Sequence, residues 1–346
     1  MTRRQLLAAS VLPLVRSTAQ SAEKPFRNLG GGPAGFPIRA RAMREAQKPF
    51  DFVDYCHSLS FAIAETRFDP SKPDAVRNLR QKLDSYNMRV ILDIPLPRDE
   101  AGVPAFDSAV QSAHDAGAYG LHAAMTQRRY EQFDTLEAFQ QDFARCQRVI
   151  MLAEPVLRKH RVRLAIENHK GWRAAEQAAW LKRVSSEWVG VHFDFGNNVS
   201  LCEEPAETLR ILLPYIFSCH IKDMAVEPYP DGFLLSEVPL GEGFLNIPYM
   251  VETIQRRDPN IPFDLEMITR DPLKIPVFTD KYWVTFDDAV SPLPGRDLAH
   301  VLGIVLQKGS KTPLPKITGM SLDAQLKLED DNVQTSIAYA RRHLNL

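Results

Sequence analysis

Four residues of the types that bind metal ions each stand at the end of a short apolar segment. They are Glu167 in RLAIENH, Asp194 in VGVHFDFGN, His220 in FSCHIKD and Glu266 in FDLEMI. Three carboxylates and one imidazole make an oxygen-rich ligand set, which suits a hard or borderline divalent cation. We therefore expect the four to share one ion. Mn²⁺ fits this set best, and Mg²⁺, Co²⁺ and Zn²⁺ are the alternatives.

The spacing of these residues matches strand–helix–strand units. Asp194 follows Glu167 by 27 positions, and His220 follows Asp194 by 26, each enough for one such unit. Glu266 comes 46 positions later, which leaves room for one more unit and a long loop at 225–245 that has the length for a small hairpin. Consecutive strands of a parallel barrel are neighbours, so the four side chains are expected to meet above its C-terminal rim.

Apolar segments alternate with helix-like segments along the chain. The expected strands are 26–30, 61–67, 89–94, 119–124, 162–168, 188–195, 216–222 and 261–267, and the expected helices include 73–86, 135–159 and 204–213. Eight strands alternating with helices predict an α/β fold, the (β/α)8 TIM barrel. An open doubly wound sheet is the alternative, but no GxGxxG follows the first strand.

The alternation of side chains along each strand also favours a closed barrel. In 162–168, Leu164 and Ile166 share one face, whereas Ala165 and Glu167 share the other. All four expected metal ligands fall on the second face of their strands, which carries small and polar side chains and would line the barrel interior. A doubly wound sheet is covered by helices on both sides and should be apolar on both parities.

The chain is divided here into three parts. We assign residues 1–22 to an export signal, 23–290 to a single barrel domain and 291–346 to a C-terminal extension, with a connector at 310–319 and a helix over 321–345. The signal has a basic start with Arg3 and Arg4, then an apolar stretch, then small residues. It resembles a twin-arginine signal, which predicts a periplasmic or secreted bacterial protein.

Composition narrows the classes of partner. The chain has 346 residues, of which 45% are hydrophobic, and its formal net charge is −1. Nucleic-acid binders usually show a basic excess, so no nucleic-acid partner is expected. No run of roughly 18 apolar residues occurs, which argues against integral membrane association once the signal is removed. The four cysteines form no CxxC pair, so a cysteine-rich zinc site is excluded.

Several motifs together resemble a known family. ENH at 167–169, DFGN at 194–197, HIKD at 220–223, GEG at 241–243 and the late-strand Glu266 occur in the order found in xylose-isomerase-like barrels. These are the sugar (phosphate) isomerases/epimerases, including ketose 3-epimerases, and the resemblance covers about 26–290.

The resemblance implies roles for the four residues. Glu167, Asp194, His220 and Glu266 would be the metal ligands, and the two glutamates would also exchange a proton with the carbon next to the carbonyl. The chain departs from ketose 3-epimerases at Asn197, where those enzymes have a second histidine. Their substrate arginine after the ligand histidine is also not evident. The substrate pocket is therefore expected to differ.

Further polar residues are candidates for binding substrate. Lys222 shares a strand face with His220 and would pair with developing negative charge on the substrate. The other candidates are His169, Lys170, His192, Glu65, Glu242 and, as a wall on which a sugar stacks, Trp172. Each also has a purely structural alternative: a packed interior histidine, a solvated lysine at the rim, a charge that keeps a Gly-rich loop soluble, or a packed tryptophan.

These residues predict a metal-dependent isomerase or epimerase of a sugar or keto-sugar, acting by proton abstraction through an enediolate. One alternative is a lyase or hydratase on a 3-keto-sugar or keto-glycoside. Another is a non-catalytic exported sugar-binding barrel. A DNA-repair endonuclease would need further histidine and aspartate ligands at the strand ends. The partner expected is a small carbohydrate, and a homo-oligomer is left open.

Overall fold

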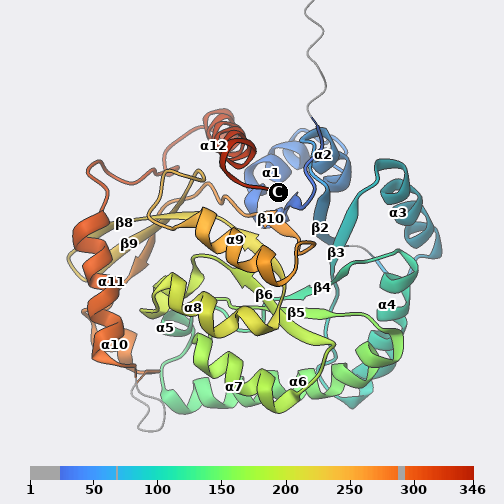
Figure 1. The fold of residues 1–346 in the computed structure, drawn as a ribbon, viewed down its shortest axis with the longest axis horizontal. Helices are drawn as coiled ribbons and strands as arrows, with labels where there is room; N and C mark the ends of the chain where they lie inside the picture. Colours follow the sequence, from blue (N-terminus) through green and yellow to red (C-terminus); the bar gives the residue numbers. More distant parts are fainter. Residues whose placement is uncertain (1–23, 68, 287–292) are drawn as a thin grey trace, which may run out of the picture.

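The computed structural model describes residues 24–67, 69–286 and 293–346, so the expected export signal lies outside the described residues. Eight parallel strands form a closed barrel in the order β1-β10-β7-β6-β5-β4-β3-β2 (Figure 1). They are β1 (Leu29–Gly31), β2 (Ile63–Arg67), β3 (Arg89–Asp93), β4 (Gly120–Ala123), β5 (Leu164–Glu167), β6 (Val189–Asp194), β7 (Ile216–Ile221) and β10 (Phe263–Leu265). Each lies within or overlaps one expected strand, which confirms the TIM barrel and excludes the doubly wound sheet.

Helices surround the barrel between the strands (Figure 1). They are α1 (Pro37–Glu45), α2 (Phe52–Ser58), α3 (Pro73–Tyr86), α4 (Val103–Asp115), α5 (Arg129–Gln132), α6 (Leu136–His160), α7 (Ala174–Val184), α8 (Pro205–Leu212) and α9 (Ile247–Arg257), with short 3-10 turns η1 (Pro33–Gly35), η2 (Glu100–Gly102), η3 (Asn197–Leu201) and η4 (Leu213–Tyr215). The helix expected over 135–159 is α6. Its first turn is capped by Thr135, whose hydroxyl accepts a bond from Ala138 N at 3.1 Å.

The long loop after β7 forms the hairpin that its sequence suggested. Strands β8 (Asp223–Tyr229) and β9 (Gly232–Val238) pair antiparallel, and β11 (Leu273–Ile275) adds a third strand to β9. Gly232 makes the turn possible, because its φ is 152° and a Cβ there would lie 2.2 Å from Ile275 O. The third strand was not predicted, since three residues carry too short a pattern to read.

The C-terminal segment packs onto the barrel. After α10 (Asp280–Trp283), the helix α11 (Gly295–Lys308) packs against β8, and α12 (Leu322–His343) packs against α1 (Figure 1). The connector at 310–319 contains neither helix nor strand, as expected. Helix α12 matches the expected tail helix, whereas α11 was not separately predicted.

The barrel interior carries ionisable groups where such barrels usually hold branched apolar residues. Glu65, His122, His192 and Asp264 come from alternate strands β2, β4, β6 and β10, and all four are buried. The rings of His122 and His192 lie 4.6 Å apart although their strands are not neighbours, so both point inward. The opposite parity, with Val189, Val191 and Phe193 on β6, joins the hydrophobic core beneath the helices.

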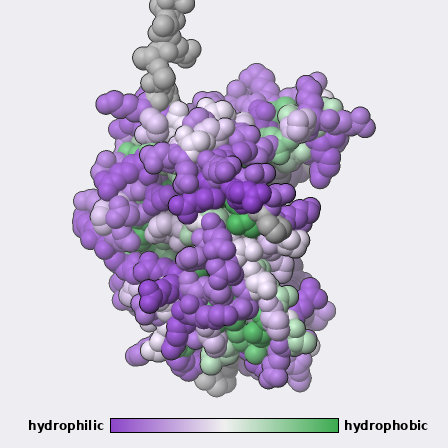
Figure 2. Space-filling model, turned by 90° about the vertical axis from the view of Figure 1, so that its right-hand side faces the viewer, coloured by the Kyte–Doolittle hydropathy of each residue, from purple (hydrophilic) through white to green (hydrophobic). Residues whose placement is uncertain are grey.

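The face of the molecule drawn in Figure 2 is largely hydrophilic, with small apolar patches. Among the described residues, no helix is both long and apolar enough to cross a membrane.

Candidate active site

The structure brings the four expected metal ligands to one place. Glu167 and Asp194 end β5 and β6, His220 lies in β7, and Glu266 directly follows β10. One ligand atom from each lies within 4.8 Å of those of the other three, and all four residues are buried. His220 Nδ1 lies 3.7 Å from Glu167 Oε1 and 3.6 Å from Glu266 Oε1. These four residues are called the ligand quartet below.

Lys222 balances part of the negative charge of the quartet. Its Nζ lies 2.6 Å from Asp194 Oδ2 and also contacts Glu266 Oε2. Burial tends to raise the pKa of Glu266, but the charges of His220 and Lys222 outweigh it and lower that pKa to about 2. Burial raises the pKa of Asp194 in spite of Lys222. Lys222 therefore stabilises two carboxylates that would otherwise be buried together without compensation.

The quartet fits a divalent cation. His220 Nδ1 is buried, faces the carboxylates and has no hydrogen-bond partner among the described residues. The other ring nitrogen, Nε2, lies 3.0 Å from Glu65 Oε2. Metal-binding histidines characteristically present one nitrogen to the ion while a carboxylate holds the other. The donor set of three carboxylates and one imidazole suits Mn²⁺, Mg²⁺, Co²⁺ or Zn²⁺.

A cavity of about 580 Å³ opens above the quartet at the C-terminal ends of the strands. Its lining includes Glu65, Glu167, His169, Lys170, His220 and Glu266, all six of which were named from sequence as ligands or substrate contacts. His192 is not in the lining. Because it lies two residues before Asp194 on the same inward parity, it sits deeper, with Nδ1 2.7 Å from Ser218 Oγ.

Three other candidates also lie outside the cavity lining. Lys222 is buried beneath it, paired with the quartet. Glu242 is exposed in the loop before α9. Trp172 is buried against Trp180, with ring centroids 5.4 Å apart, so it packs in the core and forms no wall of this cavity.

Asn197 links Lys170 to Glu167. Its Nδ2 donates to Glu167 Oε1 at 2.8 Å, and its Oδ1 accepts a bond from Lys170 Nζ. This is the position at which the resemblance to ketose 3-epimerases predicts a histidine. Burial, reinforced by the charge of Lys222, lowers the pKa of Lys170 to about 8. Lys170 is thus still mostly protonated at pH 7 and loses its positive charge as the pH rises through about 8.

The opposing effects on Glu167 keep it ionised. Burial tends to raise its pKa, but the charge of His169 and the nearby imidazoles of His122 and His220 hold that pKa well below the usual range. His169 itself has a lowered pKa because it is buried, and its Nδ1 lies 3.0 Å from Thr126 O.

His122 is a cavity residue that the sequence analysis missed. Its Nδ1 lies 2.9 Å from Asp93 Oδ1, and its Nε2 lies 3.5 Å from Glu167 Oε2. Burial tends to lower the pKa of His122, but Glu65 and Asp93 outweigh it and raise that pKa well above its usual value. The signal was present in YGLHAA, where a histidine stands near the end of the fourth expected strand.

An arginine also reaches the cavity, from a place the sequence did not suggest. Arg270 lies five residues after the last barrel strand, and it forms a two-pronged ion pair with Glu237 on β9, at 3.0 and 2.5 Å. The hairpin β8–β9 thereby holds a cationic side chain in the cavity lining.

The family follows from a sequence match that spans most of this site. The family model described as xylose isomerase-like TIM barrel matches residues 46–282, well over half of the chain. The chain belongs to this family. The matched range of this xylose isomerase-like barrel contains the whole quartet, Lys170 and Arg270.

Individual relatives are more distant. The barrel is 27% identical to 3-oxo-isoapionate decarboxylase of Pectobacterium atrosepticum over 109 residues, which cover 31% of this chain and 40% of that enzyme. The chain thus spans about two fifths of the length of this curated relative.

Two solved structures share the fold at low identity. D-psicose 3-epimerase in the presence of D-fructose superimposes with a TM-score of 0.54 at 14% identity, covering 92% of this chain and 100% of the epimerase. A xylose isomerase-like protein from Mycobacterium smegmatis in complex with magnesium gives 0.51 at 16% identity, covering 80% and 97%. At these identities, the likeness shows the fold alone.

Proposed function

We propose that this protein is a divalent-metal-dependent isomerase or epimerase of a sugar or keto-sugar. The observation that carries the proposal is the quartet itself, in which Glu167 and Glu266 lie within 4 Å of the same imidazole nitrogen beneath an open cavity. The sugars named for relatives on the same barrel support the substrate class.

Two glutamates of the quartet would carry out the proton transfer. Both glutamates have lowered pKa values, so both are ionised at neutral pH and able to accept a proton. One removes the proton from the carbon next to the substrate carbonyl, and the other returns it. A divalent cation held by the quartet would supply Lewis-acid polarisation of that carbonyl. Lys170, connected to Glu167 through Asn197, offers positive charge to the enediolate oxygen.

A lyase or hydratase acting on a 3-keto-sugar or keto-glycoside is the second candidate. The likeness to a decarboxylase favours it, because such enzymes also build up negative charge next to a carbonyl. A non-catalytic sugar-binding barrel has no need of a complete quartet with two ionised glutamates, so we place it last.

The test follows hydrogen isotopes. Purified protein is analysed for bound metal, reloaded with Mn²⁺ or Mg²⁺, and incubated with keto-sugars in D₂O while the products are observed by NMR. An epimerase introduces one solvent deuterium and yields an isomer, whereas a lyase releases a fragment. We expect E167Q and E266Q to abolish exchange and the exposed control E242Q to retain it. No bound metal and unchanged activity in both glutamate variants would refute the proposal.

We also propose that the protein is exported, on the strength of Arg3, Arg4 and the apolar stretch that follows them. Fractionation of cells that express the full chain and a R3K/R4K variant tests this. Periplasmic protein that becomes cytoplasmic in the variant is the expected result, and an equal distribution of both contradicts it.

A further inference from the structure

Lys170 is a buried cation that has no acidic partner. It is 4% exposed, and its Nζ donates to the amide oxygen of Asn197. It forms no ion pair with any carboxylate among the described residues. An ammonium has three N–H donors, so two of them remain available to a ligand. Because an unpaired buried charge is costly, this arrangement indicates that negative charge binds here together with the substrate.

The carboxylates that line the same cavity are held by other groups. Two of them belong to the quartet and would bind the cation. The other two lie against imidazoles: Glu65 Oε2 is 3.0 Å from His220 Nε2, and Asp93 Oδ1 is 2.9 Å from His122 Nδ1. None of these described carboxylates forms an ion pair with Lys170.

A second cation, Arg270, lines this cavity. It binds Glu237 through Nε and Nη2, which leaves Nη1 without a partner among the described residues. Burial lowers the pKa of Lys170 most, and the positive charges of Lys222 and Arg270 add to the effect, so Arg270 acts on the same ammonium. An ammonium and a guanidinium nitrogen in one cavity can each bind one oxygen of a carboxylate.

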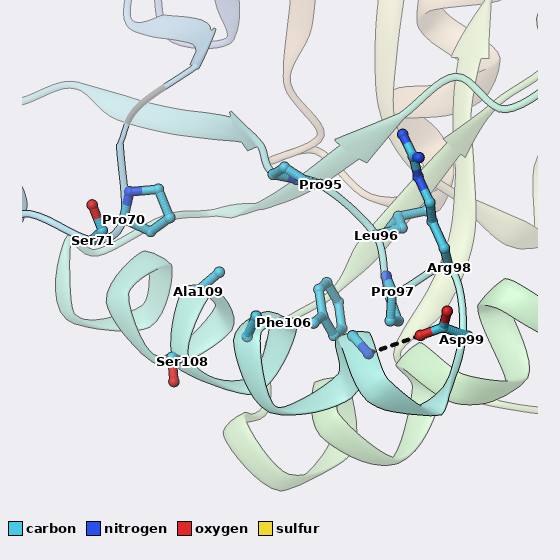
Figure 3. A pocket seen from close by; sticks show the side chains of 12 residues that line it. Pro70, Ser71, Pro95, Leu96, Pro97, Arg98, Asp99, Phe106, Ser108 and Ala109 are labelled. Carbon is cyan, nitrogen blue, oxygen red and sulfur yellow. Dashed lines mark hydrogen bonds between the residues drawn. The ribbon is translucent and has the colours of Figure 1, made fainter.

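Two other arginines near the strand ends are solvated and do not require a ligand. The side chain of Arg67 lines the same cavity but is 86% exposed. Arg98 is also exposed, in the lining of a cavity of about 630 Å³ over α4 (Figure 3). None of the described residues in that lining belongs to the quartet. Lys170 is therefore the cation whose charge a substrate is expected to neutralise.

We propose that Lys170 and Arg270 bind a carboxylate of the substrate, which is then a keto-sugar acid with its carboxylate next to the reacting carbonyl. This rests on the proposed function, because the carbonyl must lie at the quartet. Asn197 links Lys170 to Glu167, so an anion bound to Lys170 lies near the reacting carbon. With two N–H groups available, Lys170 can contact both a carboxylate oxygen and the adjacent enediolate oxygen.

The experiment compares two substrates that differ at one carbon. 2-Keto-D-gluconate carries a carboxylate where D-fructose carries a hydroxymethyl group, and the rest of the two molecules is the same. Exchange of the hydrogen on C3 for solvent deuterium by the metal-loaded full chain gives kcat/KM for each. We expect 2-keto-D-gluconate to be preferred by roughly 10–100-fold. Its uncharged methyl ester should lose this preference.

Variants test whether Lys170 is the source of the preference. K170M removes the charge and nearly keeps the length of the side chain. Because Lys170 also contacts the enediolate, we expect K170M to slow both substrates and to reduce the preference for the acid to about threefold or less. K170R keeps a positive charge and should retain most of the preference. Lys274 is exposed on β11 and lies outside the lining of this cavity, so K274M is the matched control and should keep the full preference.

A double variant tests the second cation. R270Q/E237Q removes both charges of that ion pair together, so no buried carboxylate is left unpaired. We expect it to lower the preference for the acid in part, and an unchanged preference overturns the role of Arg270. The same comparison decides the proposal should K170M fail to fold.

The outcomes separate this proposal from the proposed function. Equal kcat/KM for the two substrates, or a preference for the acid that K170M leaves intact, overturns the carboxylate site and leaves the proposed function standing. Absence of exchange with every substrate overturns the proposed function. Isothermal titration calorimetry of the metal-loaded chain then decides the carboxylate site. Tighter binding of 2-keto-D-gluconate than of D-fructose that K170M abolishes and K274M retains supports it, and equal affinities, or a difference that K170M leaves intact, overturn it.

Discussion

Glu65 Oε2 lies 3.0 Å from His220 Nε2, which joins two residues 155 positions apart in the chain. Glu65 lies in the middle of β2, and His220 lies on β7, three strands away around the barrel. Both side chains are buried, so the contact decides which ring nitrogen His220 turns toward the other three ligands. The carboxylate holds Nε2 and leaves Nδ1 free to face Glu167 and Glu266.

The first prediction concerns this contact. E65Q keeps a hydrogen-bond acceptor for His220 but removes the negative charge that makes the imidazole a better donor to a cation. We expect affinity for Mn²⁺ to fall by roughly 10–100-fold, with the fold intact by circular dichroism. Isothermal titration calorimetry measures it. E242Q, an exposed carboxylate outside the cavity, is the control, and equal affinities in the two variants would contradict the role given to Glu65.

The second prediction concerns His122, whose raised pKa leaves a positive charge beside Glu167. Replacing it in H122Q removes that charge, so the pKa of Glu167 rises toward its usual value. We expect the acidic limb of the kcat/KM profile to move to higher pH, with kcat lower by roughly 10–100-fold. H114Q alters an exposed histidine on α4 and is the control. Metal content is measured in both, because a loss of metal in H122Q would contradict a role in proton transfer.

Much of the fold could be predicted because strand parity carried the information. On β6, Val191 and Phe193 face the helices while His192 and Asp194 face the barrel interior. Successive side chains of a strand point to opposite sides, so a shift of one residue would bury the polar side chains beneath the helices. Spacing then placed Glu167, Asp194 and His220 on successive strands. Strand β11 could not be read, because its three residues depend on pairing with β9, which lies far away in sequence.

The cavity lining was harder to predict than the quartet. Arg270 follows the last barrel strand in an irregular segment, and its ion pair is with Glu237, which lies on a distant hairpin. The sequence also does not tell how deep in the barrel a side chain lies. His192 and Asp194 point to the same side of β6, but they are two residues apart along the strand, so His192 lies in the barrel interior and Asp194 in the quartet. Glu242, chosen for its Gly-rich loop, is simply exposed.

The third prediction concerns pH. Glu203 is buried near the start of α7, where its Oε2 accepts from Ala174 N at 2.9 Å and from Asn198. Burial raises its pKa from 4.5 to about 7 in spite of these bonds. Below pH 4.5 the Glu203 carboxyl is protonated in both the folded and the unfolded chain, and its contribution to the free energy of unfolding is fully present. As pH rises toward 7 the unfolded chain releases the proton first, so that stability is lost.

In the E203Q variant the side chain at position 203 is uncharged at every pH, so its free energy of unfolding lacks this dependence on pH. Relative to E203Q, the wild-type chain should therefore lose roughly 2–3 kcal/mol of unfolding free energy between pH 4.5 and 8. Urea unfolding at several pH values measures it. E242Q should run parallel to the wild type, because its carboxylate is exposed. A constant difference between wild type and E203Q across this range would show that Glu203 titrates normally.

The last prediction asks whether the C-terminal segment is part of the folded barrel. Glu329 on α12 is buried and accepts from Ile38 N at 2.9 Å and Arg39 N at 2.8 Å, so it caps the first turn of α1 from another helix. E329A leaves these two amides without a partner, and we expect a loss of about 1–3 kcal/mol in unfolding free energy. D331A removes only an exposed pair with Lys327 and should cost a few tenths. If E329A and D331A cost the same, α12 is a detachable appendage; if E329A alone is costly in a single cooperative transition, α12 folds with the barrel.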